Sequence, residues 1–239
     1  MIVKHIFNMK NNTPLQLIDS TGEMWKSLTT EERYFLRENT KYIEFKKNEL
    51  IYEEGTTPQY LYCLLHGKVK IFKSGIGGRP QIIRLVREGE TFAYRAYFSE
   101  HIYLTSAAAI ELTGCYQVPL HVIRQIVELN NKFAMSFIKL LSNDLGLMDA
   151  RVVSLTQKHI RGRLAETLVM LLDIYGADPE TGILNGTLSR EDLACFANMT
   201  ASNAIRTLSQ FDSEGLIRIN GKRIAITNIT QLRKVSDNG

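Results

Sequence analysis

The chain has 239 residues, of which 44% are hydrophobic and 23% are charged. These proportions are typical of a soluble globular protein, and no apolar run approaches the roughly 18–20 residues of a membrane span. The formal net charge of +4 permits a polyanionic partner without requiring one. Residues 159–239 contain nine Lys or Arg and nine Asp or Glu, so their net charge is zero.

Three cysteines lie far apart in the sequence, a spacing that indicates neither a disulfide framework nor a metal site. The first residues lack the sustained apolar stretch and small-residue cleavage site of a signal peptide. We therefore expect a cytoplasmic protein of one or two domains. The cysteines are Cys63, Cys115 and Cys195.

The N-terminal part of the chain predicts a helix followed by a β-domain. Residues 24–39 have a helical pattern, with Thr29 or Thr30 as the N-cap. From about residue 41 the apolar residues alternate with polar ones, and glycine-containing turns separate the runs. Several short strands of this kind predict a sandwich or barrel of about 80 residues, which ends near Pro119.

Residues 120–157 contain no proline and predict one long helix. Within it, apolar residues from Ala134 onward are spaced alternately by four and three, which is the a/d seam of a coiled coil and favours a partner helix. The alternative is one buried helix of a monomer. A second stripe, Phe133, Phe137 and Leu140, is expected to pack against the β-domain. The predicted dimer seam comprises Ile138, Leu141, Leu145, Met148, Val152 and Leu155.

Two short helices are predicted after residue 188, separated by a tight turn. Ser189 and Asp192 resemble a capping box, so the first helix should begin near Arg190. Asn198 tolerates the left-handed conformation that the turn needs, and Thr200 is a good N-cap for the second helix. The inward face of the second helix should be Ala204, Leu208 and Phe211.

A hairpin follows the second helix, because two alternating segments flank Asn220-Gly221. Helix, turn, helix and hairpin together predict a winged helix, which presents the start of its second helix to the major groove and its wing to phosphates. The candidate DNA-binding residues are Thr200, Ala201, Ser202, Asn203 and Arg206 on the helix, and Arg218, Lys222 and Arg223 on the wing.

The tract LSREDLACFANMTASNAIRTLSQFDSEGLI resembles the helix-turn-helix of the cyclic-AMP receptor protein/FNR (Crp/Fnr) family of bacterial transcription regulators. A looser likeness, YLYCLLHGKVKIF with VREGETF, covers the β-domain. The resemblance implies an α+β chain with a β-roll sensor at 1–119, a dimerisation helix at 120–157 and a winged helix at 158–239. It also implies a homodimer that binds an inverted-repeat operator, RNA polymerase as a partner, and a small-molecule effector.

The resemblance places Arg206 on the arginine that reads guanine in the family. Its alternative role is a surface arginine paired with Asp212 or Glu214. Where the family has Arg and Glu at the start of the recognition helix, this chain has Ala201 and Ser202, which are equally consistent with surface positions. The target sequence should therefore differ from the usual half-site. Asn203 could pair with adenine, and Ala201 could contact a thymine methyl group.

The cyclic-nucleotide members of the family clamp the ligand with Gly-Glu and Arg-Ser pairs. In this chain Tyr94 and Arg95 stand at the first pair, and Thr105 replaces the arginine, whereas Ser106 is retained. A cyclic phosphate needs a cation, so cyclic AMP is not expected to be the effector. Arg95 is either a surface residue or a partner for another anion. The candidate effector pocket comprises Glu90, Phe92, Arg95, Thr105 and Ser106.

No catalytic, cofactor or metal site is predicted. An iron–sulfur cluster needs about four cysteines, and the five histidines are isolated, although their number alone does not exclude haem. Nucleophile motifs and phosphate-binding loops are also absent. The sequence thus predicts a DNA-binding transcription regulator that is not an enzyme. The alternative is a small-molecule-binding regulatory protein whose winged helix mediates protein contacts.

Overall fold

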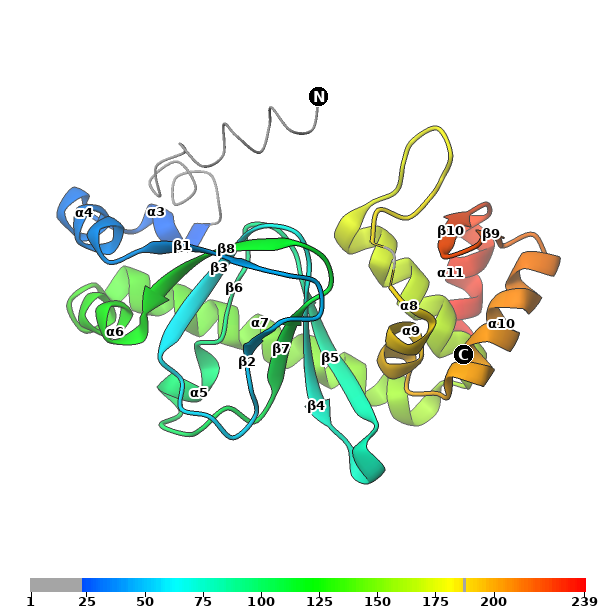
Figure 1. Ribbon diagram of the computed structural model, residues 1–239, viewed down its shortest axis with the longest axis horizontal. Coiled ribbons are helices and arrows are strands. Elements are labelled where there is room, and N and C mark those ends of the chain that lie inside the picture. The colour runs from blue at the N-terminus through cyan, green and yellow to red at the C-terminus, as the bar shows by residue number, and fades with distance from the viewer. Residues whose placement is uncertain (1–22, 187) are drawn as a thin grey trace. The chain divides into compact units, whose positions relative to one another are not determined.

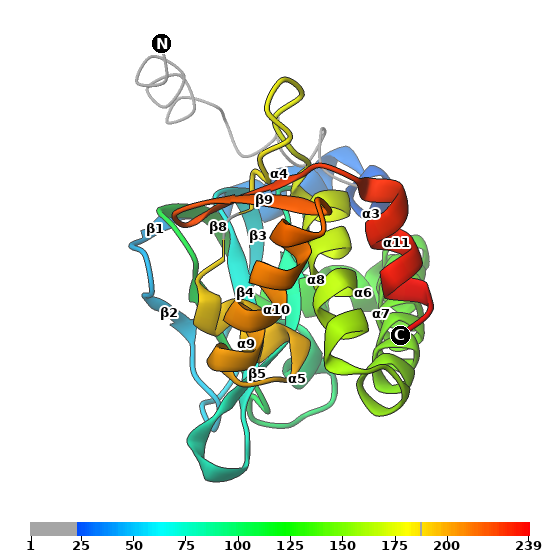
Figure 2. The same cartoon turned by 90° about the vertical axis from the view of Figure 1, so that its right-hand side faces the viewer.

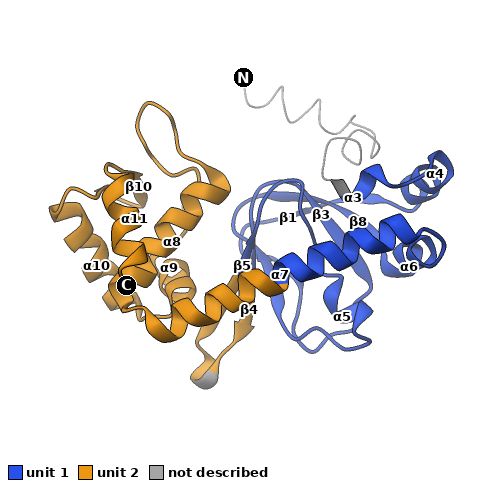
Figure 3. Ribbon diagram, turned by 180° about the vertical axis from the view of Figure 1, so that it is seen from behind, with its two compact units in different colours: residues 1–71, 84–144 blue, residues 72–83, 145–239 orange. Residues whose placement is uncertain are grey.

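The computed structural model describes residues 23–186 and 188–239. The chain forms two compact units, shown in Figure 3. The first takes residues up to Ile71 together with Arg84–Asp144, and the second takes Phe72–Ile83 together with Leu145–Gly239. The boundary at Asp144 falls inside a long helix, α7 (Asn131–Gln157).

Residues 41–119 form a roll of two four-stranded sheets (Figure 1), which confirms the predicted β-domain. The strand orders are β1-β8-β3-β6 and β2-β7-β4-β5, and the pairs β1–β8, β3–β8, β3–β6 and β2–β7 are antiparallel. The strands are β1 (Lys41–Phe45), β2 (Leu50–Tyr52), β3 (Tyr60–His66), β4 (Val69–Ser74), β5 (Pro80–Val86), β6 (Thr91–Phe92), β7 (Ser106–Ala109) and β8 (Thr113–Pro119).

Aromatic side chains fill much of the space between the two sheets. Tyr62 stacks on Phe92 with ring centroids 5.5 Å apart, and Tyr52 stacks on Tyr103 at 4.1 Å. These rings belong to one buried cluster with Phe45 and several small aliphatic residues. Alternation in the strands thus directs large rings inward, where they bury apolar area and pack at the offset geometries that aromatic pairs prefer.

The helical N-terminal segment is divided into two short helices, α3 (Glu23–Lys26) and α4 (Thr30–Glu38), rather than one. Thr29 is the N-cap of α4, in agreement with the sequence. Its hydroxyl accepts a hydrogen bond from the Glu32 amide at 3.2 Å, and the Glu32 carboxylate accepts one from the Thr29 amide at 2.8 Å. This reciprocal capping satisfies two amides that the first turn of a helix leaves unpaired.

The predicted helix at 120–157 is also two helices, α6 (Leu120–Leu129) and α7. Asn130 separates them with an extended backbone, and its Oδ1 accepts a hydrogen bond from the Phe133 amide at 3.0 Å. Its Nδ2 donates to the Ser27 carbonyl at 3.0 Å and to Glu32 at 2.8 Å. Asn130 therefore caps α7 and ties it to the N-terminal helices.

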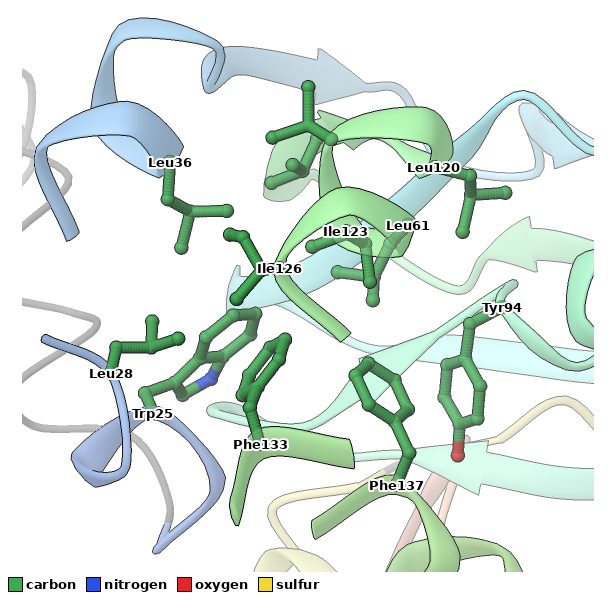
Figure 4. Packing of buried hydrophobic residues seen from close by; sticks show 12 residues of the cluster. Trp25, Leu28, Leu36, Leu61, Tyr94, Leu120, Ile123, Ile126, Phe133 and Phe137 are labelled. Atoms are coloured by element: carbon green, nitrogen blue, oxygen red, sulfur yellow. The ribbon is translucent and has the colours of Figure 1, made fainter. Parts of the chain in front are cut away.

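One face of α7 packs into the core of the first unit, as predicted for the second stripe (Figure 4). Phe133 lies against Trp25, with ring centroids 5.7 Å apart, and Phe137 lies against Phe133 and Tyr94 at 5.3 and 5.4 Å. Leu140 is partly buried against the same cluster.

The coiled-coil seam of α7 lies outside that core. Ile138, Leu145 and Val152 are 54%, 64% and 60% exposed. Leu141, Met148 and Leu155 are half-buried. The seam is therefore not buried within the single chain, because three of its six residues are among the most exposed large apolar residues that the structure describes.

The second unit contains the predicted helix-turn-helix and hairpin and, in addition, a C-terminal helix that was not predicted (Figures 1 and 2). This helix packs against α8, is capped by Asn228, and buries Leu232 completely. The elements are α8 (Ile160–Tyr175), α9 (Arg190–Ala197), α10 (Ala201–Ser213), β9 (Ile217–Asn220), β10 (Arg223–Ile226) and α11 (Ile229–Asp237).

The short helical elements η1 (Ile76–Gly78) and α5 (Arg95–Phe98) complete the fold. In the part of the chain that the structure describes, none of the helices combines the length and apolar character needed to cross a bilayer.

Candidate nucleic-acid interface

Local sequence determines where α9 begins and ends and where α10 begins. Ser189 accepts a hydrogen bond from the Asp192 amide at 3.0 Å and so caps the start of α9. At the end of α9, Asn198 has φ 50° and ψ 58°, the left-handed conformation expected for it. Thr200 then caps α10 by accepting from the Asn203 amide at 3.2 Å. Ser189 and Thr200 are therefore N-caps as predicted, and Thr200 fixes where α10 begins.

α10 divides cleanly into a buried and an exposed face. Its buried residues are Ala204, Thr207, Leu208 and Phe211, which include the three predicted from the sequence. Figure 2 shows α10 at the front of the view. The residues on its other face are more accessible. Thr200, Ser202 and Arg206 are exposed, and Ala201 and Asn203 are half-buried. The start of the helix thus presents hydrogen-bonding groups to the outside of this unit.

Arg206 is held by a neighbour on its own helix. Its Nη2 donates to the Asn203 Oδ1 at 3.0 Å. Neither acid proposed as its alternative partner pairs with it in the structure: Asp212 accepts from the Ile219 amide at 3.2 Å, and Glu214 pairs with Arg161. A guanidinium held in this way keeps its remaining donors for a planar acceptor, such as the N7 and O6 edge of guanine.

The wing is a two-stranded antiparallel hairpin beside the helices. Asn220 pairs with Arg223, so the two loop residues are Gly221 and Lys222, one position later than the predicted Asn220-Gly221. Gly221 has φ 57°, which a residue without a Cβ adopts freely. Arg218, Lys222 and Arg223 are all exposed. The hairpin therefore presents its three candidate phosphate-binding cations to solvent.

Arg190, at the start of α9, fixes the wing to the helices. Its Nη2 donates to the Gly221 carbonyl at 3.1 Å. Burial lowers the pKa of the Arg190 guanidinium from its ordinary value, although Glu191 opposes this effect. The sequence predicts only that a helix begins near Arg190. Its contact with the wing was not predicted, because Gly221 lies 31 residues away.

Arg163 on α8 supports the turn from behind, and sequence analysis missed it. Its Nε donates to the Ala197 carbonyl at 2.9 Å, and its Nη2 donates to the Asn198 carbonyl at 3.1 Å. Its Nη1 donates to the Lys158 carbonyl at 2.9 Å. One guanidinium thus joins the end of α9, the turn, and the link between α7 and α8.

Arg151 provides a second support from the C-terminal half of α7. Its guanidinium lies 4.5 Å from the centroid of the Phe196 ring and donates to the Phe196 carbonyl. It also pairs with Glu166 on α8 at 3.6 Å. Burial lowers the pKa of Arg151, and the carboxylate of Glu166 counteracts this change.

The candidate effector residues lie in the first unit and differ in their exposure to solvent. Arg95 is exposed at the start of α5, whereas Phe92 is buried in the aromatic cluster. The Thr105 hydroxyl lies 3.3 Å from the Tyr52 hydroxyl, and Ser106 Oγ accepts from the Glu54 amide at 2.9 Å. The retained serine is therefore already engaged by the chain itself.

Ala93, directly before Tyr94, has φ 71°, the left-handed region that favours glycine.

A half-buried arginine, Arg84, lies on β5, and two carboxylates already pair with it. Arg84 pairs with Glu90 at 3.1 Å and with Asp144 at 3.2 Å, and Tyr94 donates to Asp144 at 3.4 Å. Burial acts to lower the pKa of Arg84, but the two carboxylates outweigh it and leave this pKa above its ordinary value. Glu90 was predicted from the sequence, but Arg84 and Asp144 were not, because their contact joins positions 60 residues apart.

Comparison with known proteins covers both units. Residues 42–130 match the family model of the cyclic nucleotide-binding domain, and residues 162–235 match that of the Crp-like helix-turn-helix domain. The chain is 22% identical to the CRP-like cAMP-activated global transcriptional regulator of Mycobacterium tuberculosis over 80% of its own length and 86% of that protein. It is 24% identical to the anaerobic regulatory protein of Bacillus subtilis, over 74% and 75% of the two chains.

A solved structure has the same fold. FixK2 from Bradyrhizobium japonicum superposes with a TM-score of 0.74 at 22% identity, covering 82% of this chain and 96% of that one. Because one chain carries the nucleotide-binding roll and the Crp-like helix-turn-helix in this order, and similar regulators match most of its length, it belongs to the Crp/Fnr family of transcription regulators.

Proposed function

We propose that the chain is a homodimeric regulator that binds an inverted-repeat DNA operator and responds to an effector other than cyclic AMP. The observation that carries this proposal is the exposed start of α10, where Asn203 holds Arg206 beside small side chains. This geometry suits direct readout in the major groove, and the cations of the wing suit the flanking phosphates. In the cell its further partner is RNA polymerase.

The seam on α7 supports the dimer. Exposed Ile138, Leu145 and Val152 alternate with Leu141, Met148 and Leu155, so the a positions hold two β-branched residues and the d positions hold mostly leucine. This distribution favours a parallel two-stranded coiled coil. A second copy would cover apolar surface that the single chain leaves in water.

The chemistry of the roll argues against a cyclic nucleotide. A cyclic phosphate needs an available cation, but Thr105 replaces the family's arginine and Arg84 is already paired with two carboxylates. We expect calorimetry with cyclic AMP and cyclic GMP to show no binding at millimolar ligand. Micromolar affinity for either nucleotide would contradict this part of the proposal.

The zero net charge of residues 159–239 favours one alternative function, in which the winged helix contacts a protein. DNA affinity that comes from Lys and Arg neutralising phosphates falls steeply as the salt concentration rises, whereas the affinity of a neutral protein contact does not. Salt dependence therefore belongs in the test.

The test is a binding titration of full-length protein on DNA enriched by selection from random sequences, with scrambled DNA as the control. Arg206→Ala should cost about 1–3 kcal/mol on the selected site and leave scrambled DNA nearly unaffected, because a base contact is lost. Lys222→Ala should weaken both DNAs alike and reduce the slope of log K against log salt by about one.

Equal losses on both DNAs for Arg206→Ala would remove its role as a base reader. Binding that is insensitive to salt, or no binding to any DNA, would favour the protein-contact alternative.

A further inference from the structure

One exposed apolar residue on α10 has no role in the core. Ile205 is 50% exposed, and among the described residues between 158 and 239 it is the one large hydrophobic side chain classed as exposed. The buried face of α10 is complete without it. A β-branched residue at an exposed helical position gains nothing from intrinsic helix propensity, so folding does not account for isoleucine here.

Its place on the helix puts it among the candidate base-reading residues. Ile205 lies one turn after Ser202 and one turn before Ser209, and both serines are exposed and short. It precedes Arg206 directly. The isoleucine side chain therefore projects from a part of the surface that its helical neighbours do not cover.

Arg206 is drawn away from Ile205. With 3.6 residues per turn, Arg206 lies about 100° around the helix from Ile205 and about 60° from Asn203, on the opposite side. The 3.0 Å hydrogen bond to Asn203 thus directs the guanidinium away from the isoleucine. The helix therefore presents apolar Ile205 and cationic Arg206 next to each other, and the arginine side chain does not cover the isoleucine.

In the major groove the apolar group that a side chain can meet is the C5 methyl of thymine. We propose that Ile205 contacts this methyl group in each half-site, close to the guanine that Arg206 reads, and so specifies thymine at one position. This inference rests on the proposed DNA-binding function and adds a specificity-determining residue to it.

The experiment removes one methyl group from the DNA. Each thymine of the selected operator is replaced in turn by uracil, symmetrically in both half-sites, and the affinities of full-length wild type, Ile205→Ala and Ser213→Ala are measured. Burying one CH₂-sized group is worth about fourfold in affinity, or about 15-fold over two half-sites. We expect such a loss at one thymine position for wild type and for Ser213→Ala, whose substitution lies at the far end of the same exposed face.

For Ile205→Ala, thymine and uracil should bind equally at that position, because the side chain that senses the methyl is gone. The inference is overturned if wild type binds the operator but tolerates uracil at every position. It is also overturned if Ile205→Ala keeps the wild-type ratio of thymine to uracil affinity, since Ile205 would then not contact the methyl group. If wild type binds no DNA specifically, the proposed function fails as well, so the two failures are distinguishable.

Discussion

The turn between α9 and α10 illustrates, at the scale of single residues, what local sequence can and cannot predict. Ser189 and Thr200 cap helices through contacts three residues away, and Asn198 ends α9 with a left-handed backbone, so their roles were predicted correctly. Arg163 acts on carbonyls 34 and 35 residues away, so no periodicity or motif indicates it. Side chains that stabilise a site from a neighbouring element are determined by tertiary packing.

Replacing Arg163 with methionine should loosen the turn, because the substitution keeps an apolar stem but removes every donor. The carbonyls of Ala197 and Asn198 would lose a charged partner, which we expect to destabilise the second unit by at least about 2 kcal/mol. Hydrogen–deuterium exchange over residues 190–200 and urea unfolding measure the effect.

Arg233→Met is the matched control. Its ion pair with Asp173 is about half exposed, with the two side chains 49% and 53% accessible, so its loss should cost well under 1 kcal/mol. If the two variants shifted stability and exchange equally, Arg163 would be an ordinary surface arginine.

Among the elements, α7 carries two different faces. The Phe133 and Phe137 face is buried in the first unit, and the seam with Leu145 and Val152 is exposed. Both stripes could be read from spacing alone. The break before α7 could not, because Asn130 is held by Ser27 and Glu32 from the N-terminal helices, about 100 residues earlier.

Charged residues on the seam should separate a dimer. We expect the double variant Leu145→Glu, Val152→Glu to sediment as a monomer, because two buried a positions would become like-charged pairs across the interface. Leu145 and Val152 are chosen because they are exposed, whereas Leu141 also packs against the core of the first unit.

Leu147→Glu provides the control, since Leu147 is 65% exposed but lies off the seam. It should remain dimeric in sedimentation velocity. A double variant that stays dimeric would place the interface elsewhere on the chain.

For the whole molecule, the order of roll, long helix and winged helix follows from changes in period along the sequence, from alternation to helical spacing and back. The side-chain contacts inside the roll do not follow from these periods. Aromatic packing around Tyr62 and Tyr103 and the pairing of Arg84 with Asp144 join distant strands and a helix. Spacing alone does not fix such contacts.

The central claim is that two copies of α10 read DNA as a symmetric pair. Selection of binding sites from random duplex DNA by full-length protein tests it directly. The account predicts an enriched inverted repeat whose half-site centres lie about one helical turn apart, roughly 34 Å, with a guanine in each half that Arg206→Ala no longer selects. Enrichment of a single unrepeated site, or of no sequence at all, would contradict it.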